Sequence, residues 1–278
     1  MAIVLGLLTA VFFGSGDFAG GLATKRTSVI NVVGFSHLIG LLGTLALIPF
    51  FANGFSWDAL LIGAFAGAMG GIGVALLYRG LARGPMAVIA PLTAITSAAV
   101  PTAWGVLGGE SLSLIGWAGV LLALIAIGLV SSPAESESAA VTGRAVGEAL
   151  LAGACFGAMF IAFDAAPDDS APWPVVGARL LTTTSLLGFM FVAMRDRIGT
   201  AATAKVPIFA AGLLDTGSNL LFLLATQLGD LSIVAVLSSL YPAFTVLLAR
   251  FVLDERMSRV QLGGLVAAIV ATTLIAVA

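Results

Sequence analysis

Ten uninterrupted apolar runs follow one another along this 278-residue chain. A helix of roughly 20 apolar residues spans the hydrocarbon core of a bilayer, which is about 30 Å thick. The sequence therefore predicts an all-α membrane protein with ten transmembrane helices. The runs lie near residues 2–22, 29–51, 58–78, 86–107, 112–131, 146–163, 173–194, 206–227, 231–252 and 260–278.

The composition of the chain favours a bilayer over water as its surroundings. Hydrophobic residues make up 60% of the chain and charged residues 9%, which leaves too little polar surface to coat a soluble globule. The runs are continuously apolar rather than alternating, so helices are favoured over a membrane barrel. We expect no signal peptide, and we expect the first helix to remain in the protein.

The second half of the chain repeats the first. Residues 84–119 align without a gap with residues 229–264, and this alignment places Glu110 on Glu255. Near the start of each half, Phe13-Gly14 aligns with Phe156-Gly157. Weak internal symmetry in an apolar chain is typical of secondary transporters built from two repeats.

A stretch rich in Ser, Ala and Glu separates the two halves. We interpret residues 132–145 as a flexible linker between a first repeat at 1–131 and a second repeat at 146–278. Each repeat contains five helices, so the second repeat enters the membrane from the opposite side. The predicted fold is therefore a pair of inverted five-helix repeats.

Basic residues predict the orientation of the chain. Eleven of the twelve lie in or beside loops that follow odd-numbered helices, whereas the loops after even-numbered helices carry only acids. Short cytoplasmic loops collect Lys and Arg. We therefore expect a multi-pass protein of the bacterial inner membrane with both termini external.

Three motifs in the second repeat carry a family resemblance: residues 238–242 (SSLYP), 253–256 (LDER) and 262–264 (LGG). Weaker copies occur at 90–93 (APLT) and 108–111 (GGES). The chain resembles the EamA-type transporters of the drug/metabolite transporter (DMT) superfamily over nearly its whole length. Within that family it is similar to bacterial amino-acid exporters of the YddG type, which implies efflux of amino acids, including aromatic ones, by alternating access.

The first repeat departs from this pattern. It has Thr96-Ser97 where the second repeat has Tyr241-Pro242, and Pro101 follows one turn later. The helix kink is therefore displaced, and the two halves of a cavity need not be chemically alike.

Polar residues inside the spans are rare and costly, at roughly 2.5 to 3.5 kcal/mol for a charge at a helix centre. His37 lies about 14 Å into its span at about 1.5 Å per residue. Asp215 and Asn219 are four residues apart and share one helix face. We treat all three as substrate-pathway candidates, and contacts that only join helices are the open alternative.

Two more charged residues lie within spans. Arg179 is a candidate for binding a substrate carboxylate, although it can instead pair with one of Asp164, Asp168 and Asp169. Asp17 is either a cavity acid or a structural acceptor. Tyr78 is either an interfacial anchor or part of a cytoplasmic gate.

Two helix faces are our candidates for symmetric walls of a central cavity, because Thr93 and Ser238 are repeat equivalents. Prolines allow both helices to bend, and aromatic rings there offer contacts to aromatic substrates. Packing of small polar residues, with Trp104 in an outer aromatic belt, is the open alternative. The candidate residues are Pro91, Thr93, Ser97, Pro101 and Trp104 on one helix, and Ser238, Ser239, Tyr241 and Pro242 on the other.

The sequence shows no pattern of an enzyme, a metal site or a cofactor site, because no Walker loop and no ligand cluster is present. Scattered basic residues on short loops also argue against nucleic-acid binding. The expected partners are a small-molecule substrate, the lipid bilayer and, as a further candidate, protons, and a monomer is consistent with the sequence. A multidrug or nucleotide-sugar exchanger and a channel-like facilitator are the alternatives left open.

Overall fold

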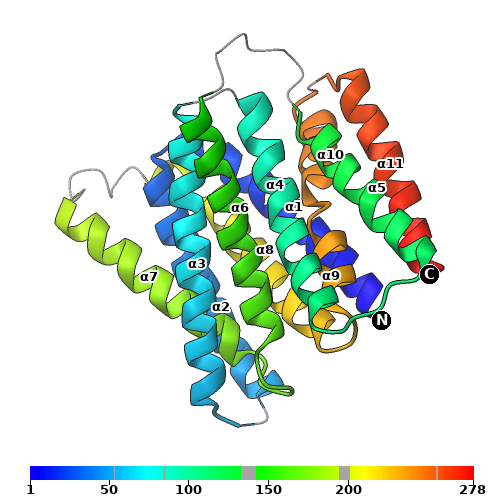
Figure 1. Ribbon diagram of the computed structural model, residues 1–278. Helices are drawn as coiled ribbons and strands as arrows, with labels where there is room; N and C mark the ends of the chain where they lie inside the picture. Colours follow the sequence, from blue (N-terminus) through cyan, green and yellow to red (C-terminus); the bar gives the residue numbers. More distant parts are fainter. Residues whose placement is uncertain (53, 84–85, 133–141, 194–200, 255) are drawn as a thin grey trace.

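The computed structural model describes residues 1–52, 54–83, 86–132, 142–193, 201–254 and 256–278. Helices account for most of these ranges (Figure 1). They are α1 (Ala2–Thr24), α2 (Val29–Phe51), α3 (Trp57–Leu81), α4 (Met86–Leu107), α5 (Leu114–Val130), α6 (Gly143–Asp164), α7 (Trp173–Ala193), α8 (Lys205–Thr226), α9 (Leu231–Ser238), α10 (Tyr241–Val252) and α11 (Arg259–Ala276).

Hydroxyl residues at the N-caps explain where several of these helices begin. Ser28, Ser113 and Thr142 each accept a hydrogen bond from the backbone N–H three residues further on. Ser258 forms a reciprocal capping box with Gln261 at the start of α11. Such caps stabilise a helix by about 1 kcal/mol each.

The span expected over residues 231–252 is not one continuous helix. It is interrupted between α9 and α10, although the two together form one membrane-length apolar stretch. Pro242 has no N–H and cannot continue the helical ladder. The backbone instead turns tightly, with the N–H of Leu240 donating to the carbonyl of Leu237 and that of Ala243 to the carbonyl of Leu240. The proline thus breaks this span rather than only bending it.

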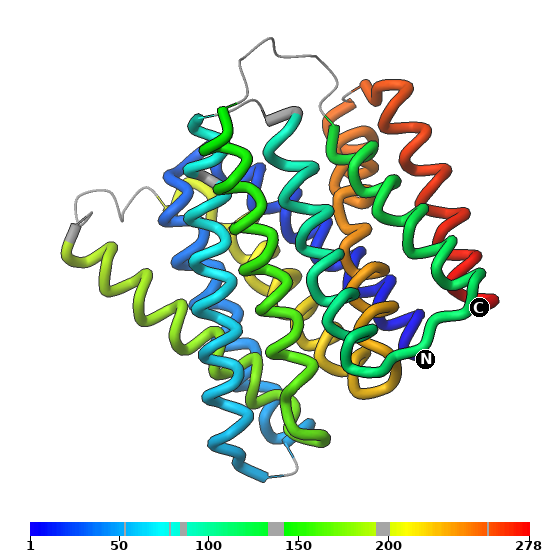
Figure 2. The backbone as a smooth tube through the Cα atoms, in the orientation of Figure 1, coloured from blue at the N-terminus to red at the C-terminus, as the bar shows by residue number. Residues whose placement is uncertain are grey.

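Both chain termini lie at the same end of the bundle (Figures 1 and 2). We call this the terminal end, and we call the opposite end, where α5 ends and α6 begins, the linker end. Nine described stretches are long and apolar enough to cross a membrane, and the shorter apolar helix α5 makes a tenth. The number of spans therefore agrees with the prediction.

Helix packing follows the symmetry of the two repeats. Helix α1 packs on α8, and its repeat counterpart α6 packs on α3. Helix α4 packs on α6, whereas α9 and α10 pack on α1. Helices α5 and α11, the last of each repeat, pair at the side of the bundle (Figure 1).

Repeat-equivalent glycines allow equivalent helices to approach closely. A Cβ atom at Gly67 in α3 would lie 2.6 Å from the carbonyl oxygen of Ala178 in α7. A Cβ atom at Gly212, which aligns with Gly67, would lie 2.5 Å from the carbonyl oxygen of Ser36 in α2. The fold is an all-α membrane protein with two inverted five-helix repeats, as predicted.

The buried core differs between the two ends of the bundle. Toward the terminal end, one cluster joins residues of α1, α2, α3, α6, α7, α8 and α9, and a second joins residues of α1, α4, α5, α9 and α11. At the linker end there are two separate clusters. One contains Ala23, Val32 and Ile208 of α1, α2 and α8, and the other contains Ile89 and Ala149 of α4 and α6 with partly buried residues of α3. Helices α1, α2 and α8 therefore share one cluster with α3 and α6 at the terminal end, whereas at the linker end these two groups of helices form separate clusters. In this sense the described chain is closed at the terminal end and divided at the linker end.

All four tryptophans lie near the terminal end. Trp57 and Trp173 begin α3 and α7, Trp104 is near the end of α4, and Trp117 is in the first turn of α5. Trp57, Trp104 and Trp117 are exposed on the outer surface. An aromatic belt of this kind is typical of a membrane–water interface.

Candidate functional site

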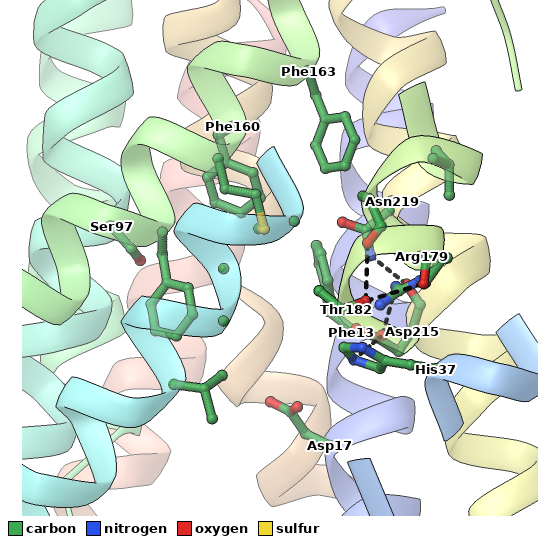
Figure 3. Close-up of a pocket in the computed structure, with 18 of the residues that line it drawn as sticks. Phe13, Asp17, His37, Ser97, Phe160, Phe163, Arg179, Thr182, Asp215 and Asn219 are labelled. Atoms are coloured by element: carbon green, nitrogen blue, oxygen red, sulfur yellow. Dashed lines mark hydrogen bonds and ion pairs between the residues drawn. The ribbon is translucent and has the colours of Figure 1, made fainter. Parts of the chain in front are cut away.

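A cavity of about 280 Å³ lies in the middle of the bundle, between the two linker-end clusters. Helices from both repeats line it (Figure 3). Phe163 and Val175, on the terminal-end side, are almost completely buried, whereas Asp17 and Gly71 are exposed. The cavity therefore opens toward the linker end.

Three polar side chains from three helices meet on one wall of the cavity (Figure 3). Nη2 of Arg179 in α7 lies 2.6 Å from Oδ2 of Asp215 in α8. Nε2 of His37 in α2 lies 3.9 Å from the same carboxylate oxygen. The carboxylate of Asp215 is therefore the centre of this group.

Residues next to Asp215 fix its position on α8. The hydroxyl of Ser218 donates to the Asp215 carbonyl oxygen at 2.6 Å, and the side-chain amide of Asn219 donates to the same oxygen at 2.7 Å. A Cβ atom at Gly16 would lie 3.2 Å from the Asp215 backbone nitrogen, so α1 packs directly against this turn. The carboxylate is held by a rigid local backbone.

Among the described residues, the guanidinium of Arg179 has a donor without a partner in addition to its ion pair with Asp215. The residue is 5% exposed. Its Nη2 atom is in the ion pair with Asp215, whereas its Nε atom makes no hydrogen bond within the part of the chain that the structure describes. A buried donor left unpaired costs about 1–3 kcal/mol. Arginine binds carboxylates with two parallel N–H donors, so this guanidinium can bind an anionic group in addition to Asp215.

A second carboxylate, that of Asp17 in α1, faces the same cavity apart from the Arg179 group (Figure 3). Besides His37 and the Tyr241 phenol, the described lining residues have three ionisable groups. These are the carboxyl groups of Asp17 and Asp215 and the guanidinium of Arg179. The lining therefore holds two carboxyl groups against one guanidinium. Asp17, which is not part of the Arg179–Asp215 pair, favours a positively charged group in the cavity.

The opposite wall of the cavity is apolar. It consists of aromatic and aliphatic side chains of α3 and α6, whereas Phe13 of α1 lies beside the Arg179 group (Figure 3). The ring of Phe160 stacks on Phe222 with centroids 4.4 Å apart, and Phe13 lies 6.2 Å from Phe160. The wall residues are Val74, Leu77, Phe156, Met159, Phe160 and Phe163. The cavity thus has one charged wall and one apolar wall.

Several of the predicted pathway residues line this cavity: His37, Ser97, Arg179, Asp215, Asn219 and Tyr241. The alternative in which Arg179 pairs with Asp164, Asp168 or Asp169 is wrong, because Arg179 pairs with Asp215. Tyr78 lies in α3, but its side chain is outside the described residues.

The expectation that α4 and the α9–α10 span form the two main walls is corrected by the structure. The hydroxyl of Thr93 donates to the carbonyl of Ala149 in α6, and that of Ser238 donates to the carbonyl of Gly6 in α1. Ala149 and Gly6 are themselves repeat equivalents. The predicted symmetry is therefore present, but it serves helix packing.

The remaining residues of those two faces also lie outside the cavity lining. Trp104 is 58% exposed on the outer surface, and Ser239 is fully buried. Pro91 and Pro101 lie within α4, and Pro242 lies in the first turn of α10. Only Ser97 and Tyr241 of these faces reach the cavity.

The apolar wall was missed by reasoning from the sequence. A phenylalanine in an apolar span is chemically like its neighbours, and only side-chain direction separates a cavity ring from a lipid-facing one. One signal was available, because Phe13 and Phe156 align between the repeats. Both line the cavity.

Comparison with known proteins agrees with this architecture. The family model described as "EamA-like transporter family" matches residues 1–132 and 144–277. An uncharacterized protein of Methanocaldococcus jannaschii is 29% identical over 133 residues, which are 47% of this chain and 96% of that protein. That relative is about the size of one expected repeat.

A solved crystal structure, described only as that of a protein, shares the fold. The TM-score is 0.78 at 17% sequence identity, and the match covers 99% of this chain and 96% of the other. The family match extends over almost the entire chain and describes transporters rather than enzymes. The chain is a multi-pass membrane protein that belongs to the EamA-like transporter family.

Proposed function

We propose that this transporter exports amino acids, including aromatic ones, and related small metabolites across the bacterial inner membrane by alternating access. The observation that carries the proposal is the cavity with one charged and one apolar wall. An amino acid has a carboxylate, an ammonium group and a side chain. The cavity offers a complementary group for each of the three.

Arg179 is the binding partner of the substrate carboxylate, because it lines the cavity and its Nε has no partner within the described part of the chain. Asp17 and Asp215 supply the carboxyl groups that bind the ammonium group. Aromatic side chains gain about 0.5–1.5 kcal/mol beyond area burial when they contact another ring. Phe156 and Phe160 supply such rings opposite the charged wall.

The opening of the cavity supports export. It opens toward the linker end, where the basic loops predict the cytoplasm. A cavity that loads from the cytoplasm and is closed toward the outside is the first state of an export cycle. Proton coupling belongs to the same proposal, with His37, Asp17 and Asp215 as the groups that can exchange a proton.

Counterflow in proteoliposomes tests the substrate proposal. Vesicles preloaded with unlabelled phenylalanine should take up labelled phenylalanine and, more weakly, labelled alanine, and the uptake should saturate. Uptake that does not saturate indicates a channel-like facilitator. Exchange of nucleotide sugars or cationic dyes but not of amino acids contradicts the proposal and supports the other exchangers.

Cysteine labelling tests the orientation. In a Cys155→Ser background, a cysteine at Asp168 should react with an impermeant maleimide in intact cells. A cysteine at Ser131 should react only after the cells are opened. The opposite pattern contradicts external termini.

A further inference from the structure

Glu110 lies in the turn between α4 and α5, yet its carboxylate binds the first turn of α9. Oε1 accepts a hydrogen bond from the N–H of Leu231 at 2.8 Å, and Oε2 accepts one from the N–H of Ser232 at 2.9 Å. The first N–H groups of a helix have no partner within the helix, and a negative charge there is stabilised by the helix dipole. One side chain of the first repeat thus caps a helix of the second.

The turn holds Glu110 in this position. Its backbone N–H donates to the carbonyl of Gly105 at 3.0 Å. A Cβ atom at Gly105 would lie 2.6 Å from the Glu110 carboxyl carbon, so only glycine leaves room for it. Asp230, at the N-cap of α9, makes no capping bond with its own side chain. The distant carboxylate therefore takes the place of a local cap.

This contact lies at the end of the bundle that is closed. Helix α1 packs on both halves of the span, whereas α4 packs on α9, the half nearer the terminal end. A second contact supports the first, because the hydroxyl of Thr102 in α4 donates to the carbonyl of Ser232 at 3.4 Å. The two repeats are therefore joined through α4 and α9 on the closed side.

Inverted repeats exchange their arrangements when a transporter changes state. Helix α4 contacts α9, the terminal-end half of the span that is its repeat counterpart. After the exchange, α4 must instead contact that span at the linker end. We propose that Glu110 is a latch that stabilises the state open at the linker end, and that it must release Leu231 and Ser232 before the terminal end can open. This proposal rests on the proposed alternating access.

Two reporter cysteines in a Cys155→Ser background measure the state of the purified protein without any substrate. Ala166→Cys lies in the terminal-end cluster, where Ala166 is 6% exposed. Val74→Cys lines the cavity that opens toward the linker end. The rate of reaction with a soluble maleimide should rise at the first and fall at the second when the terminal end opens.

Glu110→Gln removes the charge and one of the two acceptors. We expect the Ala166→Cys rate to rise about threefold to tenfold, which is the effect of losing one net hydrogen bond, and we expect the Val74→Cys rate to fall.

Glu148→Gln is the matched control. Glu148 pairs with Arg79 of α3 at 3.3 Å and with Arg83, so it joins α3 to α6, two helices of one linker-end group. This control should leave both rates unchanged.

A second pair of variants keeps Glu110 and removes a donor. Leu231→Pro and Leu231→Ala both lose the buried side chain, but only proline loses the N–H. Proline is well tolerated at the first helical position, and Asp230 before it already has the extended backbone that proline prefers, with ψ 132°. The proline variant should react faster at Ala166→Cys than the alanine variant.

Equal rates for wild type and Glu110→Gln, or for the two Leu231 variants, overturn the latch. So does a rise at Ala166→Cys without a fall at Val74→Cys, because that pattern indicates local loosening. Failure of the proposed function is a separate result. If the reaction rates of the reporter cysteines shift as expected but the protein shows no amino-acid counterflow, the substrate proposal is contradicted and the latch proposal stands.

Discussion

Helices α3 and α8 are repeat equivalents that face the same cavity, yet they present opposite chemistry to it. Helix α8 contributes Asp215 and Asn219, whereas the aligned positions of α3 are Gly70 and Val74. All four residues line the cavity. The duplicated helices therefore retained their positions and diverged in their side chains.

Hydrogen bonds between helices, in contrast to the cavity side chains, are equivalent in the two repeats. Thr93 with Ala149 and Ser238 with Gly6 are the same hydrogen bond made twice, at aligned positions. The comparison teaches that packing in this fold is two-fold symmetric and that binding chemistry is not. A cavity with two unlike walls is how a symmetric scaffold can orient an asymmetric substrate.

The largest effect should come from removing the cation of the charged wall. Arg179→Ala leaves the Asp215 carboxylate without its partner, so counterflow of amino acids should fall more than tenfold. Asp215 is 35% exposed, so the loss of stability should be below the roughly 3–5 kcal/mol of a fully buried pair. Thermal unfolding measures this loss, and the double variant Arg179→Ala/Asp215→Asn should be more stable than Arg179→Ala. Equal stability of the two would argue against a coupled pair.

The second prediction makes the two walls more alike. Val74→Asn gives α3 the side chain that α8 has at the aligned position. A polar group placed against an apolar substrate without a partner costs about 1–3 kcal/mol, so the apparent affinity for phenylalanine should fall about fivefold or more. Val74→Leu is the size-matched apolar control. If both variants lose affinity equally, volume rather than polarity sets the preference.

A smaller effect is expected from the apolar wall itself. Phe156→Leu keeps an apolar side chain but removes the ring, and this loses about 0.5–1.5 kcal/mol of aromatic contact. Transport of phenylalanine should weaken by about twofold to tenfold relative to that of alanine. Trp104→Leu, on the outer surface, should leave this ratio unchanged. A change in the ratio with Trp104→Leu would restore that ring to the pathway.

The smallest effect concerns the symmetric packing bonds. Thr93→Val and Ser238→Ala each remove one hydrogen bond between helices, which is worth about 0.5–1.5 kcal/mol. Both variants should unfold at slightly lower temperature and by similar amounts, with the ratio of phenylalanine to alanine transport unchanged. A change in substrate preference in either variant would place that hydroxyl in the binding site.

Hydropathy and internal alignment are sufficient to predict the spans and the inverted repeats, because both depend on the average character of long segments. The charged wall was also accessible, since a charge within an apolar span needs a partner or a function. The partners of these charges could not be predicted from the sequence. Arg179 and Asp215 lie on different helices, and only the packing of α7 and α8 against α2 brings them together.

Hydroxyls and rings were the harder part of the prediction. Thr93 and Ser97 lie on one face of α4 by their spacing, but a small rotation of the helix decides which of them reaches the cavity. In the structure Thr93 bonds to α6 and Ser97 lines the cavity. Helical periodicity gives the residues that share a face, whereas the direction of that face depends on tertiary contacts.

The one-sided distribution of the four tryptophans has an optical consequence. Their emission arises almost entirely from one leaflet of the bilayer, because Trp57, Trp104, Trp117 and Trp173 all lie near the terminal end. A brominated or spin-labelled lipid restricted to the outer leaflet of a vesicle will quench this emission strongly in molecules inserted with the terminal end outward and weakly in the others. The intrinsic tryptophan fluorescence of the native protein therefore reports the direction in which the protein was reconstituted.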